Sequence, residues 1–426
     1  MDSFIFMMAL FVALLFLGLP ISICIGMGVS AALVMEDISL EFVAQICFSG
    51  LNNYTYIAIP MFILAGLLME TGGLSQRLVD FASSLIGNIP GGLGIITVLS
   101  CMFFAAISGS SPATVAAIGS MMLPQMARNG YDLHFAGALT ACAGSMGILI
   151  PPSIPMIIYA ITAEVSIGEI FTAGFIPGAL IGGGLMLCVY LVSRKRGYRG
   201  AADFGKSPWQ TFRKAIWSLL TPVIILGGIY AGIFTATEAA VVAVLYALVV
   251  GLYIHRELKF SDLYSIFLNA ALTTGSVIVI LGFATAFARY LTMLQIPQMV
   301  GKLLLSYTNN PTVILCLFVL LIFFTGMFIE TASQILIYTP LFLPILVELG
   351  VSPVHFGIIL VIGTEIGLIT PPVGVNLFVV QGITKSSIVQ LTRNLAPFLF
   401  SMVACQTVLV LFPGLVMFLP NLVYGR

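Results

Sequence analysis

The chain has 426 residues, of which 60% are hydrophobic and 8% are charged, and its formal net charge is zero. Soluble domains carry about 25% charged residues, so this composition indicates a chain that lies in a lipid bilayer. A zero net charge gives no electrostatic basis for binding nucleic acid. The seven cysteines and three histidines are dispersed, without a CxxC motif, so we expect neither a transition metal nor a disulfide framework.

Long apolar runs begin near the first residue and continue to the last. They are Ile5–Met35, Phe135–Ala163, Thr172–Val192, Ala215–Ile254 and Pro397–Leu419. Each meets or exceeds the roughly 20 residues that cross the hydrocarbon of a bilayer. We interpret the first run as a membrane span, or a span with part of a second, bent near Pro20, because no basic residues precede it as in a signal peptide. The predicted fold is an all-α polytopic membrane protein.

Residues 109–159 and 329–379 repeat one pattern of punctuating residues at a fixed offset of 220 positions. Pro151-Pro152 matches Pro371-Pro372, and Gly147 matches Gly367. The other matching pairs are Pro124 with Pro344, Gly130 with Gly350, Gly137 with Gly357 and Pro177 with Pro397. A long apolar pattern that occurs twice predicts a duplicated half and not a solenoid. We predict a first repeat over 1–193, a linker over 194–214 and a second repeat over 215–426.

Each predicted repeat contains two interrupted elements. The apolar arms 95–107 and 115–126 flank the polar stretch Ser108–Thr114, and arms of this length reach only about 20 Å as helices. We therefore predict a re-entrant helical hairpin over about 92–127, and its equivalent over about 311–347. The crossings at about 135–163 and 354–383 are broken by glycines and consecutive prolines. Irregular backbone at membrane depth is tolerated where it is buried in protein or lines a wet cavity.

The linker 194–214 carries seven of the 16 basic residues, which places it in the cytoplasm by the positive-inside rule. Counting spans outward from it predicts that the first hairpin, next to Arg128, opens to the cytoplasm and the second opens to the opposite side. The two repeats are therefore expected to be inverted relative to each other. The same count puts both chain termini outside the cytoplasm.

Inverted repeats with paired broken helices are typical of secondary transporters, whose site lies near the membrane midplane. A broken helix leaves free C=O groups that suit Na⁺ and free N–H groups that suit a carboxylate. We therefore expect two hairpin tips and two helix breaks to meet, with about two Na⁺ sites. The Na⁺-binding candidates are Ser108, Ser110, Ser111, Thr114, Gly144, Ser145, Gly147, Glu330, Thr331, Ser333, Gly363, Thr364 and Gly367. The substrate-binding candidates are Pro112, Pro151, Pro152, Ser153, Gln334, Thr370, Pro371, Pro372, Asn376 and Arg289. The alternative for any single Ser or Thr is that it bonds the preceding helical turn or helps helices to pack.

Two carboxylates, Glu330 and Glu365, lie deep in the second copy, where the first copy has Ser110 and Ser145. Intramembrane carboxylates are costly and usually functional. Cation binding, proton coupling and an ion pair with Arg289 are all open interpretations. Neither is accompanied by a second catalytic group, so we expect no enzymatic site.

Four motifs resemble the large membrane subunit of tripartite ATP-independent periplasmic (TRAP) transporters over essentially the whole chain. They are Pro60-Met-Phe-Ile-Leu-Ala-Gly66, Gly109-Ser-Ser-Pro-Ala-Thr114, Gly147-Ile-Leu-Ile-Pro-Pro-Ser153 and Gly367-Leu-Ile-Thr-Pro-Pro-Val-Gly-Val-Asn376. The resemblance implies the ion-transporter superfamily, a bacterial inner-membrane location and an elevator mechanism. A block of hairpins and broken helices would slide against scaffold spans, among which we counted Thr172–Val192 and Ala239–Ile254.

The resemblance also implies Na⁺ coupling and two partners, a small four-helix membrane subunit and a periplasmic substrate-binding protein. The substrate would be an organic acid of the C4-dicarboxylate or sialic acid class. Three alternatives are a stand-alone Na⁺- or H⁺-coupled carboxylate symporter, an anion channel and a membrane enzyme. The sequence has no HExxH helix, GxSxG elbow or Walker A motif, which speaks against the enzyme.

Overall fold

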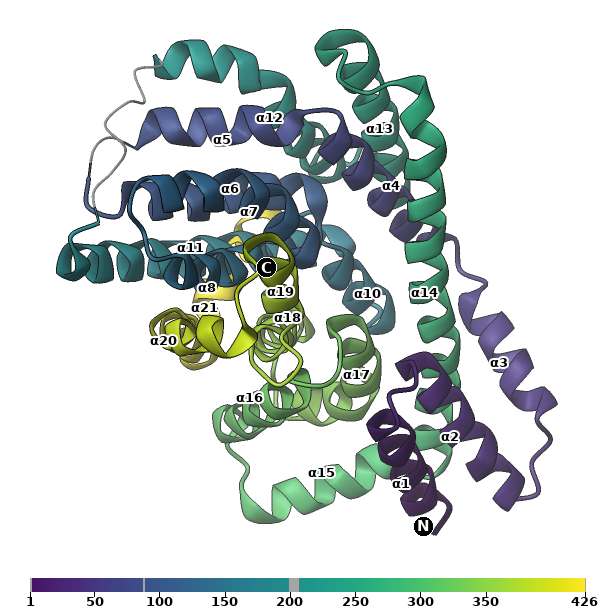
Figure 1. The fold of residues 1–426 in the computed structure, drawn as a ribbon. Coiled ribbons are helices and arrows are strands. Elements are labelled where there is room, and N and C mark those ends of the chain that lie inside the picture. Colours follow the sequence, from purple (N-terminus) through teal and green to yellow (C-terminus); the bar gives the residue numbers. More distant parts are fainter. Residues whose placement is uncertain (1, 87–88, 199–206, 426) are drawn as a thin grey trace.

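A computed structural model describes residues 2–86, 89–198 and 207–425, and this part of the chain folds into helices without a strand (Figure 1). The helices are α1 (Asp2–Phe16), α2 (Ile21–Met35), α3 (Glu41–Leu51), η1 (Tyr54–Ile57), α4 (Ala58–Thr71), α5 (Leu74–Leu85), α6 (Gly92–Ser108), α7 (Ser111–Arg128), α8 (Leu133–Gly144), α9 (Met146–Leu149), α10 (Ile154–Thr162), α11 (Ile167–Arg196), α12 (Pro208–Tyr230), α13 (Ala236–Val249), η2 (Val250–His255), α14 (Phe260–Met293), α15 (Ile296–Tyr307), α16 (Pro311–Gly326), α17 (Thr331–Glu348), α18 (Pro353–Ile369), α19 (Val375–Thr384), α20 (Ile388–Leu411) and α21 (Pro413–Tyr424). Among the described residues, seven helices are long and apolar enough to cross a membrane, or up to nine if each strongly bent pair is one span. The all-α membrane fold is thus confirmed. Of the predicted linker, residues 199–206 lie outside the described part.

The first apolar run is not one bent span. It forms two helices of 15 residues each, α1 and α2, which pack against each other as an antiparallel hairpin. Gly18 at φ +80° and Pro20 reverse the chain between them. The far ends are joined because the Ser3 hydroxyl donates to Glu36 Oε1 at 2.5 Å. Hydropathy does not distinguish one long helix from two short ones. The predicted break near Pro20 is confirmed; of the two interpretations, the single long span is wrong, and the alternative of a span with part of a second lies nearer to the two helices observed.

An outer frame surrounds one side of the molecule, and we define it as α1–α5 and α12–α15. Its longest member, α14, has 34 residues and packs along α2, α3 and α4 (Figure 1). α4 packs against α13, and α12 packs against both α5 and α13. Ala239–Ile254, which the sequence assigned to a scaffold, lies in α13 and η2 of this frame.

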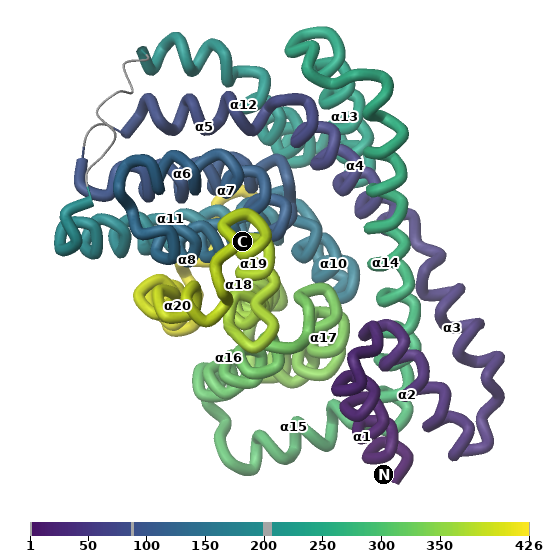
Figure 2. The backbone as a smooth tube through the Cα atoms, in the orientation of Figure 1, coloured from purple at the N-terminus to yellow at the C-terminus, as the bar shows by residue number. Residues whose placement is uncertain are grey.

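The remaining helices form an inner body, which we define as α6–α11 and α16–α21. Within the first copy α7 packs against α6 and α8, and within the second α16 and α17 pack against α18. The two copies also interlock, because α19 packs against α7 and α8 while α17 packs against α10 (Figure 2). The elements that the sequence predicted to carry the site therefore lie in one packed unit. The division of the chain into halves at 193 and 215 stays a prediction.

Helix α11, which contains Thr172–Val192, packs within the inner body and not with the outer frame. It packs against α6, α18, α20 and α21. Three glycines spaced by four residues let it approach closely: an added Cβ would lie 2.7 Å from Met156 at Gly174, 2.9 Å from Ile150 at Gly178 and 2.5 Å from Met102 at Gly182. Small residues at this spacing are a common means of close helix contact in membranes. The run that the sequence analysis counted as scaffold thus packs within the inner body, and which spans stay still during transport stays a prediction.

Two further differences concern the second half. Pro397–Leu419 is not one helix, because the backbone leaves the helical conformation at Phe412 and α21 begins anew at Pro413. A helix that the sequence analysis did not include, α15, precedes the second hairpin and meets α16 at 120°. Pro311 begins α16, and Asn310 caps it by accepting from the Thr312 N–H at 2.9 Å. A short polar stretch between two apolar helices can set a sharp turn, which the apolar composition of the helices does not reveal.

Candidate functional site

The first hairpin tip is a cluster of buried hydroxyls. α6 ends at Ser108, Gly109 turns the chain at φ +60°, and α7 begins at Ser111 with Pro112 in its first turn. The hydroxyls of Ser108 and Thr114 lie 2.8 Å apart, and that of Thr114 donates to the Ser110 carbonyl at 2.8 Å. Four of the predicted candidates, Ser108, Ser110, Ser111 and Thr114, thus lie together at the start of a helix, where N–H groups are unpaired.

The first helix break lies directly against this tip. α8 ends at Gly144, and α10 begins at Ile154 after Pro151-Pro152. An added Cβ at Gly147 would overlap the Ser110 carbonyl oxygen and lie 2.5 Å from Thr114 Oγ1. The Ile154 N–H donates to the Gly109 carbonyl at 3.4 Å. The chain can approach itself this closely because Gly147 has no side chain.

Two hydroxyls at the first break already have local partners. Ser145 Oγ donates to the Cys142 carbonyl at 2.6 Å, and Ser153 Oγ accepts from the Met156 N–H at 3.4 Å. These are the helix-terminal roles that serine commonly plays. Each oxygen keeps a lone pair beside these bonds, so the two hydroxyls and the neighbouring carbonyl oxygens could serve a cation here.

The second tip and break repeat the close approach. An added Cβ at Gly367 would lie 2.6 Å from the Cα of Gly326, where α16 ends. The Val373 N–H, just after Pro371-Pro372, donates to the Met327 carbonyl at 3.3 Å. The loop between α16 and α17 is therefore seated on the break between α18 and α19, as the first tip is seated on the first break.

Side chains of the second tip close its loop. Gln334 donates through Nε2 to the Ile329 carbonyl at 2.9 Å and accepts at Oε1 from the Thr325 hydroxyl at 3.2 Å. Ser333 Oγ donates to Glu330 Oε1 at 3.2 Å. Thr331 Oγ1 is buried and has no hydrogen-bond partner among the described residues. Gln334 is thus occupied in holding the loop, whereas the Thr331 hydroxyl is available to a ligand.

Among the predicted residues of the second break, Thr364 lies in the last turns of α18 and Thr370 directly follows the helix. Thr364 Oγ1 donates to the Val361 carbonyl at 2.9 Å, and Thr370 Oγ1 donates to the Ile366 carbonyl at 2.7 Å. Gly363 faces Gln406 of α20, whose Nε2 an added Cβ would approach to 2.9 Å. Gln406 was not among the predicted residues. Its signal in the sequence is a single amide inside the apolar run Pro397–Leu419.

The first tip also meets the second break, across the two copies. Ser111 Oγ donates to Glu365 Oε1. Asn376, in the first turn of α19, donates through Nδ2 to Ser111 Oγ at 2.7 Å, to the Ala141 carbonyl at 3.0 Å and to Glu365 Oε1 at 3.3 Å. All three side chains are buried. Asn376 was expected to bind substrate, and this structure places it in a contact between the copies.

Arg289 does not join the tips and breaks. It is an exposed residue of α14 and lines a groove of about 540 Å³ whose other walls include Phe42, Gln45 and Ser49 of α3. The opposite face of α14 carries Phe287, which is turned toward the second hairpin. Among the described residues the ion pair is between Arg77 and Glu257, and Arg289 forms none. The expected ion pair of Arg289 with a buried glutamate is therefore corrected, and its contact with substrate stays a prediction.

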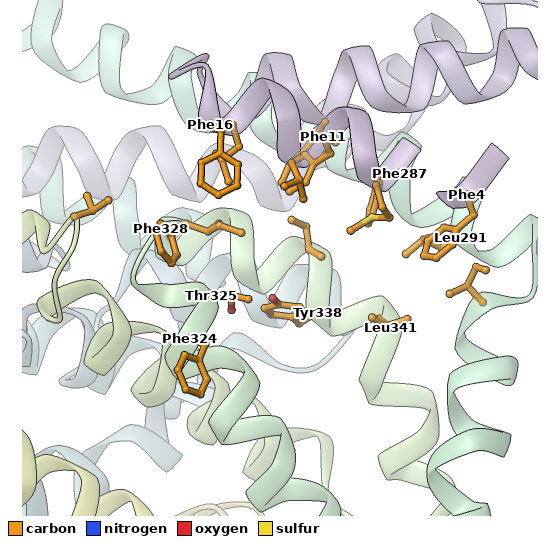
Figure 3. Close-up of a pocket in the computed structure, with 18 residues that line it drawn as sticks. Phe4, Phe11, Phe16, Phe287, Leu291, Phe324, Thr325, Phe328, Tyr338 and Leu341 are labelled. Carbon is orange, nitrogen blue, oxygen red and sulfur yellow. The ribbon is translucent and has the colours of Figure 1, made fainter. Parts of the chain in front are cut away.

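An apolar cavity of about 550 Å³ separates the second hairpin from the outer frame (Figure 3). Figure 3 shows Phe11 and Phe16 of α1 and Phe287 of α14 on one side, and Thr325 and Tyr338 of the hairpin on the other. Its lining is almost entirely apolar, so it offers an organic acid no charged partner. This space lies beside the second tip and marks a boundary between frame and body that is loosely packed.

A family model described as "Tripartite ATP-independent periplasmic transporter, DctM component" matches residues 8–415. The chain is 42% identical over 413 residues to the isethionate TRAP transporter permease protein DctMQ of Oleidesulfovibrio alaskensis, covering 96% of this chain and 65% of that relative. It thus spans just under two thirds of that protein. It is also 42% identical over 400 residues to the C4-dicarboxylate TRAP transporter large permease protein DctM of Pseudomonas aeruginosa, covering 93% of this chain and 94% of the relative.

A crystal structure of the YdaH transporter of Alcanivorax borkumensis, described as having an unusual topology, has a similar fold. The TM-score is 0.68 at 16% sequence identity, and the match covers 88% of this chain and 89% of the other. At this identity the likeness concerns the arrangement of helices alone.

Proposed function

The chain belongs to the DctM component family of tripartite ATP-independent periplasmic transporters, and we propose that it is the large permease subunit of a Na⁺-coupled importer of an organic acid. The single observation that carries this proposal is the duplicated seating of a hairpin tip on a helix break, at Gly147 and at Gly367. Each seat gathers hydroxyls, backbone carbonyls and a helix N-terminus in one place. Such groups replace the hydration of a hard cation.

Na⁺ is the coupling ion that these groups favour. Near the first tip, the candidates Ser108, Ser110 and Thr114 offer two hydroxyls and a carbonyl within hydrogen-bonding distance of one another. Near the second tip, Thr331 supplies a buried hydroxyl without a partner in the described part of the chain, and Glu330 a carboxylate. We assign one Na⁺ to each tip, which makes two sites per chain.

The substrate we propose is an organic acid of the C4-dicarboxylate or sialic acid class. Its carboxylate would be held by helix N-termini at the breaks, where Ser153 precedes α10 and Gly374 precedes α19. Helix N-termini favour anions through their unpaired N–H groups and dipole. Relatives in this family are named for C4-dicarboxylate and for sialic acid transport, which supports the class and does not choose within it.

Transport proceeds in our proposal by an elevator movement of the inner body against the outer frame. Two features support it. The two copies interlock within the body through Ser111, Glu365 and Asn376, so the site can move without being taken apart. The cavity beside the second hairpin is lined by apolar side chains, and few specific polar contacts would have to break there as the body slides.

We propose two protein partners and an inner-membrane location. The isethionate relative is named DctMQ, and this chain spans 65% of that protein's length. That supports a separate small membrane subunit, expected to have four helices, for this chain. A periplasmic binding protein would deliver the acid to the side on which the second hairpin opens.

The proposal is tested by uptake into proteoliposomes. The chain is reconstituted with its small subunit and the matching binding protein, and a panel of labelled acids is offered with an inward Na⁺ gradient or with equal Na⁺ on both sides. One acid should accumulate only with the gradient and with all three proteins. Accumulation by the chain alone would instead identify a stand-alone symporter, and unitary currents would identify a channel.

A further inference from the structure

The contact between the two copies is an incomplete set of hydrogen bonds. We define the junction cluster as Ser111, Glu365, Asn376 and the Ala141 carbonyl. Glu365 Oε1 accepts from Ser111 Oγ and from Asn376 Nδ2, and Asn376 Nδ2 also reaches Ser111 and Ala141. Two acceptors are left over. Glu365 Oε2 and Asn376 Oδ1 are buried and have no hydrogen-bond partner among the residues that the structure describes.

Among the residues that the structure describes, Glu365 forms no ion pair. Glu365 is 1% exposed and Asn376 is 0% exposed. The nearest candidate that the sequence offered, Arg289, lies exposed in the α3–α14 groove. A buried carboxylate without a compensating charge is strongly unfavourable. Both unused groups are oxygen acceptors, and hard cations are bound by carboxylate and amide oxygens.

The duplicated architecture does not require this carboxylate. At the offset of 220 positions, Ser111, Glu365 and Asn376 correspond to Thr331, Ser145 and Met156. Ser145 and Met156 belong to a break that closes without charge, where Ser145 bonds Cys142 and Met156 packs against Gly174. Of the two corresponding positions only 365 carries a carboxylate. The packing that both copies share therefore does not explain why a glutamate is present there.

We propose that Glu365 and Asn376 bind a Na⁺ in a site of their own, separate from the two tip sites, with Glu365 Oε2 and Asn376 Oδ1 as ligands. This inference rests on the proposed Na⁺ coupling and adds a third ion to it. Ser111 begins the second arm of the first hairpin, and Asn376 lies in α19 beyond the second break. A cation held by Glu365 and Asn376 fixes the second break, and the hydrogen bonds of both side chains with Ser111 tie that break to the first tip, so that both copies move as one body.

The test counts bound Na⁺ at equilibrium with ²²Na⁺, using the full chain in lipid nanodiscs. The variant Glu365→Gln keeps the side-chain volume and removes the charge. Its matched control is Glu348→Gln, at the exposed end of α17. Glu365→Gln should bind one Na⁺ fewer per chain than the wild type, and Glu348→Gln should bind the same number. Glu365→Asp, which keeps the charge on a shorter side chain, should keep the count and weaken the affinity of one site about tenfold.

Three results would overturn the inference. An unchanged count in Glu365→Gln would show that Glu365 binds no Na⁺ while leaving the tip sites, and the proposed function, intact. A carboxylic-acid infrared band can be assigned to Glu365 if it is lost in Glu365→Gln or shifted in Glu365→Asp. If that band persists in the wild type at saturating Na⁺, Glu365 carries a proton and does not bind the cation. A wild type that binds no Na⁺ would remove the proposed coupling together with this site. The Asp variant keeps the test decisive if the Gln variant does not fold.

Discussion

Gly147 lies against Ser110 so closely that an added Cβ would overlap the Ser110 carbonyl oxygen. The same relationship recurs between Gly367 and Gly326, where the added Cβ would lie 2.6 Å from a backbone Cα. Backbone atoms cannot move aside as a flexible side chain can. The two glycines therefore set the distance between each hairpin tip and its helix break, and with it the position of the oxygens gathered there.

The first prediction is that Gly147→Ala displaces the first tip. Overpacking of this kind costs about 1–3 kcal/mol, and part of it will be relieved by moving Ser110 away. Na⁺-driven uptake should fall at least about tenfold, because the carbonyl and hydroxyl geometry is lost. The matched control is Gly183→Ala in α11, where an added Cβ meets no atom within 4 Å. Wild-type uptake in Gly147→Ala would show that the close approach is not needed.

The second prediction separates ion coupling from folding. Removing a hydroxyl at the tips and breaks should raise the Na⁺ concentration for half-maximal uptake about tenfold, which corresponds to about 1.4 kcal/mol. The thermal midpoint should change little, since little volume is removed. The variants are Ser110→Ala, Ser145→Ala, Thr331→Ala and Thr364→Ala. Thr331→Ala should have the largest effect, because its hydroxyl has no partner among the described residues. If all four keep wild-type Na⁺ activation, the tips and breaks are not the cation sites.

The third prediction concerns the orientation of the chain in the membrane. Basic residues concentrate at the linker 194–214, so Ser207 should face the cytoplasm and Asn310 the periplasm. Both are exposed. Each is changed to Cys in a background that lacks the seven native cysteines, which are all free thiols, and an impermeant maleimide is added to whole cells whose outer membrane has been made permeable. Labelling of Asn310→Cys alone is expected. Labelling of Ser207→Cys would reverse the topology.

The sequence predicted where helices are interrupted better than it predicted how the helices contact one another. Gly109, Pro151-Pro152 and Pro371-Pro372 act through their own backbone, so the tips and breaks are visible in the sequence. The sequence left open whether the first run is one span or more, and the antiparallel packing of α1 and α2 was not predicted because it depends on contacts between helices of equal hydropathy. The helical periodicity that marks a buried face in water is weak in a chain that is apolar on every side.

The site was predicted in part for the same reason. Polar residues inside apolar runs identify candidates, and many of them do lie at the tips and breaks. Which candidates meet depends on tertiary contacts, so Ser111, Glu365 and Asn376 were not linked beforehand. Arg289 was expected there because it is the only basic residue of its apolar run, yet its helix presents it to α3. One charged residue in an apolar run does not reveal which neighbouring helix its face of the helix will contact.

The sliding of the inner body against the outer frame is tested most directly by joining the two across the apolar cavity. Phe287 of α14 and Leu341 of α17 line this cavity from opposite sides (Figure 3). Both are changed to Cys in the background without native cysteines and joined by a bifunctional thiol reagent long enough to span the space. The control pair is Phe287 with Leu291, one turn apart on α14, and each single-Cys variant receives the same reagent.

The measurement is the rate of labelled-acid uptake in proteoliposomes, together with equilibrium ²²Na⁺ binding. Our account predicts that the Phe287–Leu341 cross-link abolishes uptake and leaves Na⁺ binding largely intact, whereas the control pair transports as before. Uptake at the unmodified rate by fully cross-linked Phe287–Leu341 protein would contradict a sliding body and require a gate at a fixed site.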